Sequence, residues 1–204
     1  MDLLDNYKKA WENQPEHADK VSSIEIYKLA QSKSSSIVKW IFIIGILEFI
    51  FLNSIYFFVD MEDAMIEYKN LGLENFILYS QIATYIILFY FLWMFYQNYK
   101  KISTIESTKT LMTKILKTRK TVRNYVIFNL GYITLFMIVI TIAKVNTNLN
   151  DFNNKQLLIL IIVTIIATLL FLGVVWLFYQ LLYGILLRKL NRNYKELAKL
   201  DNAK

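Results

Sequence analysis

Glu48 is the residue of this sequence whose chemistry fits its surroundings least well. It stands in the middle of the apolar stretch 37–59, and a charged side chain at the centre of a membrane helix costs about 2.5–3.5 kcal/mol. No Lys or Arg stands at a comparable depth to neutralise it. Because desolvation disfavours the charged form, we expect a protonated, neutral carboxyl. This group serves either as a hydrogen-bonding contact between helices or as a site for an ion, a proton or a ligand.

Candidate partners for Glu48 are polar residues at similar depth in two other apolar stretches. Gln81 and Tyr85 stand in the second stretch, and Asn129 and Thr134 stand in the third. We expect Glu48 to hydrogen-bond to one of these residues. Four residues therefore form the predicted intramembrane polar set: Glu48, Gln81, Tyr85 and Asn129. Replacing Glu48 with Gln would preserve a packing contact, whereas a proton relay requires the carboxyl.

Residue counts exclude most catalytic chemistry. Cysteine is absent and histidine occurs once, as His17, which excludes disulfides, thiolate chemistry, Cys/His zinc sites and multi-histidine metal centres. Glu48 has no second acid or histidine beside it in the sequence, so it does not form a catalytic set. Phosphate-binding glycine loops and dinucleotide fingerprints are also missing. We expect a protein that is not an enzyme and that carries neither a metal nor a cofactor.

Four apolar stretches must position these residues, and each is long enough to cross a membrane. They cover residues 37–59, 76–96, 125–143 and 157–187, and a membrane helix needs roughly 20 apolar residues. Of the 204 residues, 56% are hydrophobic and 19% are charged, against about 25% charged in a typical soluble domain. The stretches lack the alternation of a membrane β-barrel. The expected fold is all-α: a polytopic membrane protein with four transmembrane helices and helical cytoplasmic extensions.

Basic residues are distributed unevenly between the segments that flank these stretches. Twenty of the 23 Lys and Arg residues fall in 1–39, 97–124 and 188–204, whereas the segment 60–75 is acidic. By the positive-inside rule, both termini and the middle segment are cytoplasmic. Three tryptophans stand near the predicted cytoplasmic ends of the apolar stretches, namely Trp40, Trp93 and Trp176. They agree with this orientation, since aromatic residues collect at the membrane–water interface.

Topology explains the net charge of +7 better than nucleic-acid binding does, although a polyanionic partner is the alternative. The most basic run is 114–123, and each of its cations contributes about 1 kcal/mol near anionic lipid. Five residues of this run are predicted to face lipid headgroups: Lys114, Lys117, Arg119, Lys120 and Arg123.

Three regions outside the spans have helical patterns. Residues 1–36 form an N-terminal cytoplasmic segment, in which Leu4, Tyr7 and Trp11 recur at helical spacing and then Pro15 ends the helix. This amphipathic helix lies in the membrane interface or against its own chain, or it docks on a partner through those three side chains. Ser22 and Glu25 fit a capping box for a second helix, 23–36, which continues into the first span.

The middle segment and the tail extend the spans in the same way. Residues 97–124 contain no Gly or Pro and are expected to form a helical hairpin within the transmembrane domain 37–187. The tail 188–204 continues the last span through a seam of apolar residues spaced four, three, four and three apart: Tyr183, Leu187, Leu190, Tyr194 and Leu197.

Three stretches of the sequence resemble those of a known protein family: LLDNYKKAWENQPE, KVSSIEIYKLAQSKSSSIVKWIFIIGILEF and LMTKILKTRKTVRNYVIFNLGY. With them the chain resembles a bacterial family of uncharacterised four-span membrane proteins. Its members are often labelled beta-carotene 15,15'-monooxygenase, and many of them are encoded beside extracytoplasmic-function sigma factors. The enzyme label does not fit, because carotenoid cleavage oxygenases bind iron through four histidines and this chain has one. The gene neighbourhood implies a bacterial inner-membrane partner of a sigma factor.

The sequence is therefore compatible with three kinds of function. The first is a regulatory or scaffold protein, anti-sigma-like, which binds a sigma factor through residues 1–36. The second is a small transporter, channel or lipid-binding protein that uses Glu48, and a packing subunit of a larger complex is a third reading. A homo-oligomer is compatible with each of them, and the lipid bilayer is a partner in all three.

Overall fold

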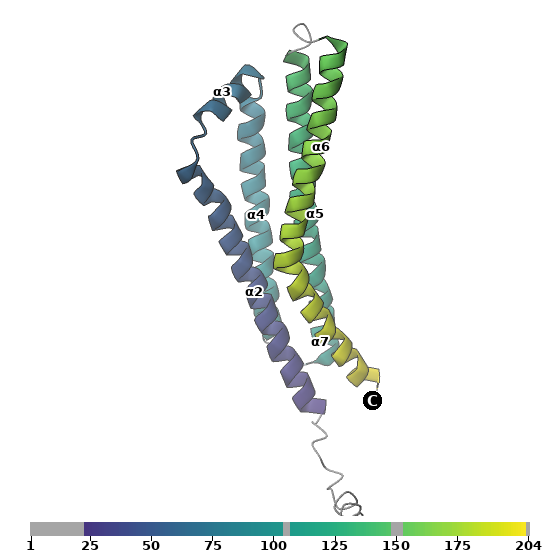
Figure 1. Ribbon diagram of the computed structural model, residues 1–204. Helices are drawn as coiled ribbons and strands as arrows, with labels where there is room; N and C mark the ends of the chain where they lie inside the picture. Colours follow the sequence, from purple (N-terminus) through teal and green to yellow (C-terminus); the bar gives the residue numbers. More distant parts are fainter. Residues whose placement is uncertain (1–22, 104–106, 148–152, 203–204) are drawn as a thin grey trace, which may run out of the picture.

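The computed structural model describes residues 23–103, 107–147 and 153–202, which form helices and turns and no strand (Figure 1). This confirms the all-α prediction. The chain order is α2 (Ser23–Phe58), α3 (Glu62–Asn70), α4 (Glu74–Ser103), α5 (Thr108–Thr147), α6 (Asn154–Tyr179), the π-helical segment η1 (Gln180–Gly184) and α7 (Ile185–Asn202). The docking residues Leu4, Tyr7 and Trp11, and the capping residue Ser22, lie outside the described residues.

Within the described residues, four helices are long and apolar enough to cross a membrane, as the sequence predicts. They are Ile24–Phe58, Glu74–Ser103, Thr108–Thr147 and Asn154–Lys199, the last of which runs through α6, η1 and α7. The protein is thus a multi-pass membrane protein. The 40-residue α5 is about 60 Å long at 1.5 Å per residue, about twice the thickness of a bilayer's hydrocarbon core. A large part of it therefore lies beyond the hydrocarbon.

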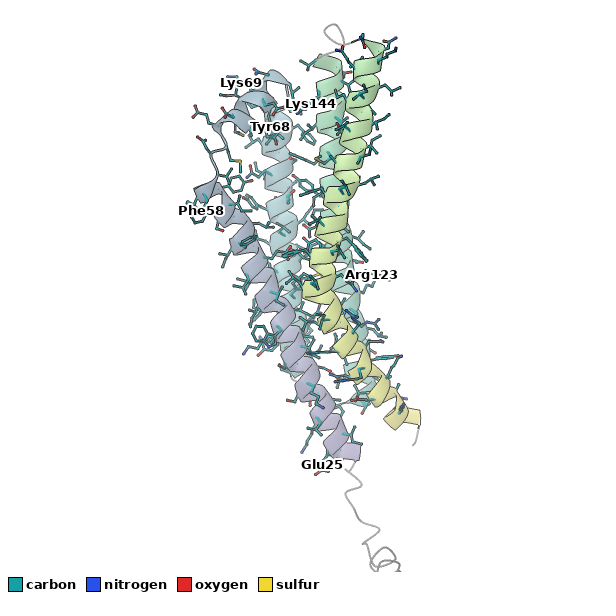
Figure 2. The ribbon with its side chains drawn as sticks, in the orientation of Figure 1. Glu25, Phe58, Tyr68, Lys69, Arg123 and Lys144 are labelled. Atoms are coloured by element: carbon teal, nitrogen blue, oxygen red, sulfur yellow. The ribbon has the colours of Figure 1, made fainter. Side chains whose placement is uncertain are left out.

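All four helices extend past their apolar stretches at the same end of the bundle. There α2 begins, α4 leads to α5 and α7 ends, while α3 lies at the opposite end (Figure 1). Figure 2 marks the first end with Glu25 and the second with Lys69 and Lys144. We call residues 23–48, 91–103, 107–125 and 179–202 the basal half, and residues 49–90, 126–147 and 153–178 the α3 half.

Every fully buried side chain of the described residues lies in the basal half. One core cluster joins the extensions: Ala30, Val38, Ile102, Leu111, Ile115, Leu190 and Leu197. The second lies nearer the middle of the bundle: Ile41, Phe91, Phe95, Val122, Tyr125, Tyr179 and Tyr183. The predicted tail seam takes part in both, because α7 packs on α2 and α5 of its own chain.

The α3 half buries none of its described side chains, although it is rich in large apolar residues. Phe57 and Phe58 are 88% and 86% exposed. Helix α3 was not predicted from the sequence. It begins with Glu62 and Asp63, acidic residues that favour the N-terminus of a helix. Lys144 of α5 forms an ion pair of 2.6 Å with Glu67 of α3, and Figure 2 shows Lys144 close to α3.

Candidate functional site

Glu48 is buried, 5% exposed, and both of its carboxyl oxygens have partners on the fourth membrane helix. The Tyr179 hydroxyl donates to Oε1 at 2.6 Å, and the Tyr183 hydroxyl donates to Oε2 at 2.9 Å. The two tyrosines are four residues apart, so they lie on one face of the helix. Tyr179 ends α6 and Tyr183 belongs to η1. The contact therefore joins α2 to the point at which α6 passes into α7.

Tyr125 of α5 completes an aromatic wall around this carboxyl. Its ring lies edge-on to Tyr179 and Tyr183, with centroids 6.0 and 5.9 Å apart, and also edge-on to Phe91 and Phe95 of α4. Edge-to-face pairs of this kind add about 0.5–1.5 kcal/mol beyond the burial of area. The Glu48–tyrosine cluster, which we define as Glu48, Tyr125, Tyr179 and Tyr183, thus draws residues from three of the four membrane helices.

The expected partners of Glu48 were wrong. The Tyr85 hydroxyl donates a hydrogen bond to Asn53 Oδ1 at 2.7 Å, and Gln81 Nε2 donates one to the Tyr85 hydroxyl at 3.4 Å. Asn129 donates to the backbone oxygen of Tyr125, one turn earlier on its own helix, at 2.9 Å. Thr134 likewise bonds within α5, to Leu130 O.

Helix rotation explains this error. The position of a residue along a span gives its depth in the membrane. It does not determine which neighbouring helix the side chain faces. Five residues separate Glu48 from Asn53, which turns the helix by about 140° at 3.6 residues per turn. Asn53 therefore faces the polar residues of α4, and Glu48 faces the fourth helix. The pair Tyr179 and Tyr183, one turn apart in the last apolar stretch, was the signal that would have pointed to the correct partners.

The family comparison covers this whole site. A family model described as Domain of unknown function (DUF8845) matches residues 24–202. The chain belongs to this family. The DUF8845 region contains all four membrane helices, the Glu48–tyrosine cluster and both core clusters. Searches of the curated proteins and of the solved structures each found no match.

Both carboxyl oxygens of Glu48 in the DUF8845 region have hydrogen-bond partners. Among the described residues, no buried side-chain nitrogen or oxygen lacks a partner, and no group of three His, Cys, Asp or Glu side chains is placed to hold a metal. An ionised carboxylate accepts both tyrosine hydroxyls, whereas a protonated carboxyl donates its own proton to one of them. The cluster is therefore able to keep its geometry while it gains or loses one proton.

Two cavities approach the Glu48–tyrosine cluster of the DUF8845 region from different sides. A cavity of about 320 Å³ between α2 and α4 is lined by Tyr125 together with polar residues of the α3 half, among them Asn53, Gln81 and Tyr85. A cavity of about 600 Å³ between α5 and the α6–η1–α7 helix is lined by Tyr179 and Tyr183. The tyrosines thus form part of the wall of each cavity.

The predicted lipid-facing cations of the DUF8845 region all lie on α5 but separate into two groups. Arg119, Lys120 and Arg123 line the larger cavity, and Lys114 and Lys117 do not. Arg188 of α7 also lines this cavity, although it was not among the cations predicted to face lipid. The sequence around Arg188 did not indicate this, because only the packing of α7 on α5 places it in the wall of the same cavity as Arg123.

Proposed function

We propose that the protein is a non-enzymatic regulatory or scaffold protein of the bacterial inner membrane, with the basal end of its helical bundle in the cytoplasm. The orientation is supported by charge, because the basic segments 97–124 and 188–204 end at the basal end of the bundle. The acidic segment 60–75, which includes α3, lies at the other end, in agreement with the positive-inside rule.

The observation that carries the proposal is the core cluster of the extensions. Ala30, Ile102, Ile115 and Leu197 of this cluster are fully or almost fully buried, and all four lie outside the predicted spans. Apolar side chains pack in this way where helices leave the hydrocarbon and water supplies the driving force. Four membrane helices do not need such a cluster to cross a bilayer. A rigid helical platform at the cytoplasmic surface suits a protein that presents a docking segment to a partner.

The partner we propose is a sigma factor, bound in the manner of a membrane-anchored anti-sigma protein. Support comes from the resemblance to proteins encoded beside sigma factors and from the apolar spacing of Leu4, Tyr7 and Trp11. Ala30 and Ser34 of the segment 1–36 are buried in the bundle. We therefore assign the contact to residues 1–22.

Co-purification of the full chain with a sigma factor of the same bacterium in mild detergent tests this function. A variant with Leu4, Tyr7 and Trp11 replaced by Ala is expected to lose the sigma factor. A matched control replaces Asp5, Lys8 and Glu12, which lie elsewhere on the predicted helical wheel, and is expected to retain it. Equal recovery of the sigma factor with both variants contradicts the assignment.

A second candidate function is proton movement through Glu48, and it is favoured by the two cavities that meet the Glu48–tyrosine cluster. In this role Glu48 accepts a proton from one cavity and releases it towards the other through a tyrosine hydroxyl. Proton flux into liposomes that contain the full chain is expected to fall to background in Glu48→Gln. Flux that is unchanged in Glu48→Gln, or absent from the wild type, rejects this role.

A further inference from the structure

The cavity between α5 and the α6–η1–α7 helix is a groove with a cationic wall. Four basic side chains line it, namely Arg119, Lys120 and Arg123 of α5 and Arg188 of α7. Of the lining residues that the structure describes, none is acidic. Arg123 and Arg188 are exposed at its edge, and Figure 2 shows Arg123 on α5, near the middle of the bundle's height.

These four cations have no carboxylate partner among the described residues. Arg119 Nη1 donates to Asn191 Oδ1 at 2.7 Å, and Arg188 Nε donates to Gly184 O at 3.3 Å on its own helix. Both acceptors are neutral, so they orient the guanidinium groups without compensating their charge. Like charges in one groove repel each other. An anion in the groove would remove that repulsion, and arginine guanidinium is the side chain best suited to phosphate.

The other end of the groove is apolar and lies towards the membrane. Val126, Ile127 and Leu130 follow Arg123 along α5, and Trp176 faces them from α6. Leu130 is seven residues beyond Arg123, about 10 Å along the helix axis. Tryptophan collects at the boundary between hydrocarbon and headgroups. The groove therefore runs from a cationic end to an apolar end across a height typical of that boundary.

The π-helical segment η1 shapes the wall opposite α5. A Cβ at Gly184 would lie 2.8 Å from Cδ and Oε1 of Gln180, so the absence of a side chain at position 184 gives the Gln180 side chain its place in the groove wall. Single π-helical turns of this kind occur often at functional sites. Gln180 adds amide donors between the cationic and apolar ends of the groove.

We propose that this groove binds one anionic phospholipid. The phosphate lies among Arg119, Lys120, Arg123 and Arg188, and the acyl chains lie along Ile127, Leu130 and Trp176 towards the hydrocarbon. Basic pockets between membrane helices on the cytoplasmic side bind anionic headgroups in this manner. The site goes beyond the regulatory function proposed above, and it needs neither residues 1–22 nor a sigma factor.

Native mass spectrometry of the full chain in neutral detergent tests the proposal. The probes are dioleoyl phosphatidylglycerol and dioleoyl phosphatidylcholine, which have the same acyl chains. The wild type is expected to retain phosphatidylglycerol in preference to phosphatidylcholine. Arg188→Gln is expected to weaken the binding of phosphatidylglycerol about 5-fold, and Arg123→Gln/Arg188→Gln about 30-fold, since each cation near anionic lipid contributes about a factor of five.

The matched control is Lys195→Gln/Lys199→Gln, which removes two exposed cations of α7 that do not line the groove. It is expected to bind phosphatidylglycerol like the wild type. Three results would overturn the proposal: equal retention of the two lipids by the wild type, an equal loss in the control, or full displacement of phosphatidylglycerol by inorganic phosphate. The last result would show that the groove recognises a free anion. Arg188→Gln keeps the test decisive if the double variant does not fold, because Arg188 is exposed.

Discussion

The basal half and the α3 half are built from the same four helices, yet they pack differently. The basal half contains all of the fully buried side chains that the structure describes, and the α3 half contains none. Leu190 in α7 is 0% exposed, whereas Leu170 in α6 is 68% exposed. Apolar composition does not explain the difference, because α6 is far more apolar than α7. In the extensions, where the helices leave the hydrocarbon, the surrounding solvent explains it: water drives apolar side chains together, whereas lipid does not.

Polar contacts follow the same division. Among the described residues, the buried side-chain hydrogen bonds lie in the basal half and join different helices, as in the bonds from Tyr179 to Glu48 and from Asn193 to Ser34. In the α3 half many hydroxyls bond to the backbone of their own helix, as Thr164 and Thr168 do. The basal half is thus the part of the molecule that fixes how the helices are arranged.

Replacing one buried and one exposed leucine gives the largest expected difference between the halves. Leu190→Ala should lower the free energy of unfolding by about 2–5 kcal/mol, because it leaves a cavity in the basal core. Leu170→Ala should change it by less than about 0.5 kcal/mol. Thermal unfolding of both variants in the same detergent measures the difference. Equal losses would mean that the α3 half is packed as tightly as the basal half.

Removing the Glu48 carboxyl tests the buried contacts of the basal half. Glu48→Ala leaves the hydroxyls of Tyr179 and Tyr183 without their acceptor, at a cost of about 1–3 kcal/mol for each buried group. Glu48→Gln keeps an acceptor and should cost less than about 1.5 kcal/mol. Asn53→Ala is the control in the α3 half, where the partner Tyr85 is only part-buried. A larger loss of unfolding free energy in Asn53→Ala than in Glu48→Ala would reverse the comparison.

Two glycines, one in each half, differ in the space that surrounds their backbone. A Cβ at Gly45 would lie 3.1 Å from Leu92 and 3.2 Å from Phe95, whereas a Cβ at Gly173 meets nothing within 4 Å. Phe95 is fully buried and has no room to move, so Gly45→Ala should destabilise the protein by about 1 kcal/mol or more. Gly173→Ala should stabilise it by up to about 1 kcal/mol through helix propensity. Melting temperatures that shift in the same direction would contradict this pair of expectations.

The smallest expected effect concerns the ion pair of the α3 half. The side chains of Lys144 and Glu67 are 41% and 52% exposed, so Glu67→Gln should cost less than about 1 kcal/mol. The loss should shrink at high salt, because screening weakens exposed pairs. Unfolding of Glu67→Gln and the wild type at two ionic strengths measures it. A loss as large as that of Glu48→Ala would show that α3 helps to hold the bundle together.

The amino-acid sequence determined the four long helices of this protein and their approximate ends, but not α3. Runs of apolar residues define the four spans, and the absence of Gly and Pro between residues 97 and 124 predicts helices that continue beyond the membrane. These features depend on neighbours along the chain, so they can be derived from composition and spacing. The tail seam was also visible in this way, since Leu190 and Leu197 repeat at heptad spacing.

Only the tertiary structure decided which side chains meet. Glu48 was identified from its depth, but its partners Tyr179 and Tyr183 depend on the rotation of α2 about its axis. Arg123 and Arg188 became neighbours in one groove because α7 packs on α5. Rotation and pairing of helices result from the fit of all their faces at once, so a local pattern such as the pair Tyr179 and Tyr183 can suggest candidate partners but does not decide which helix they meet.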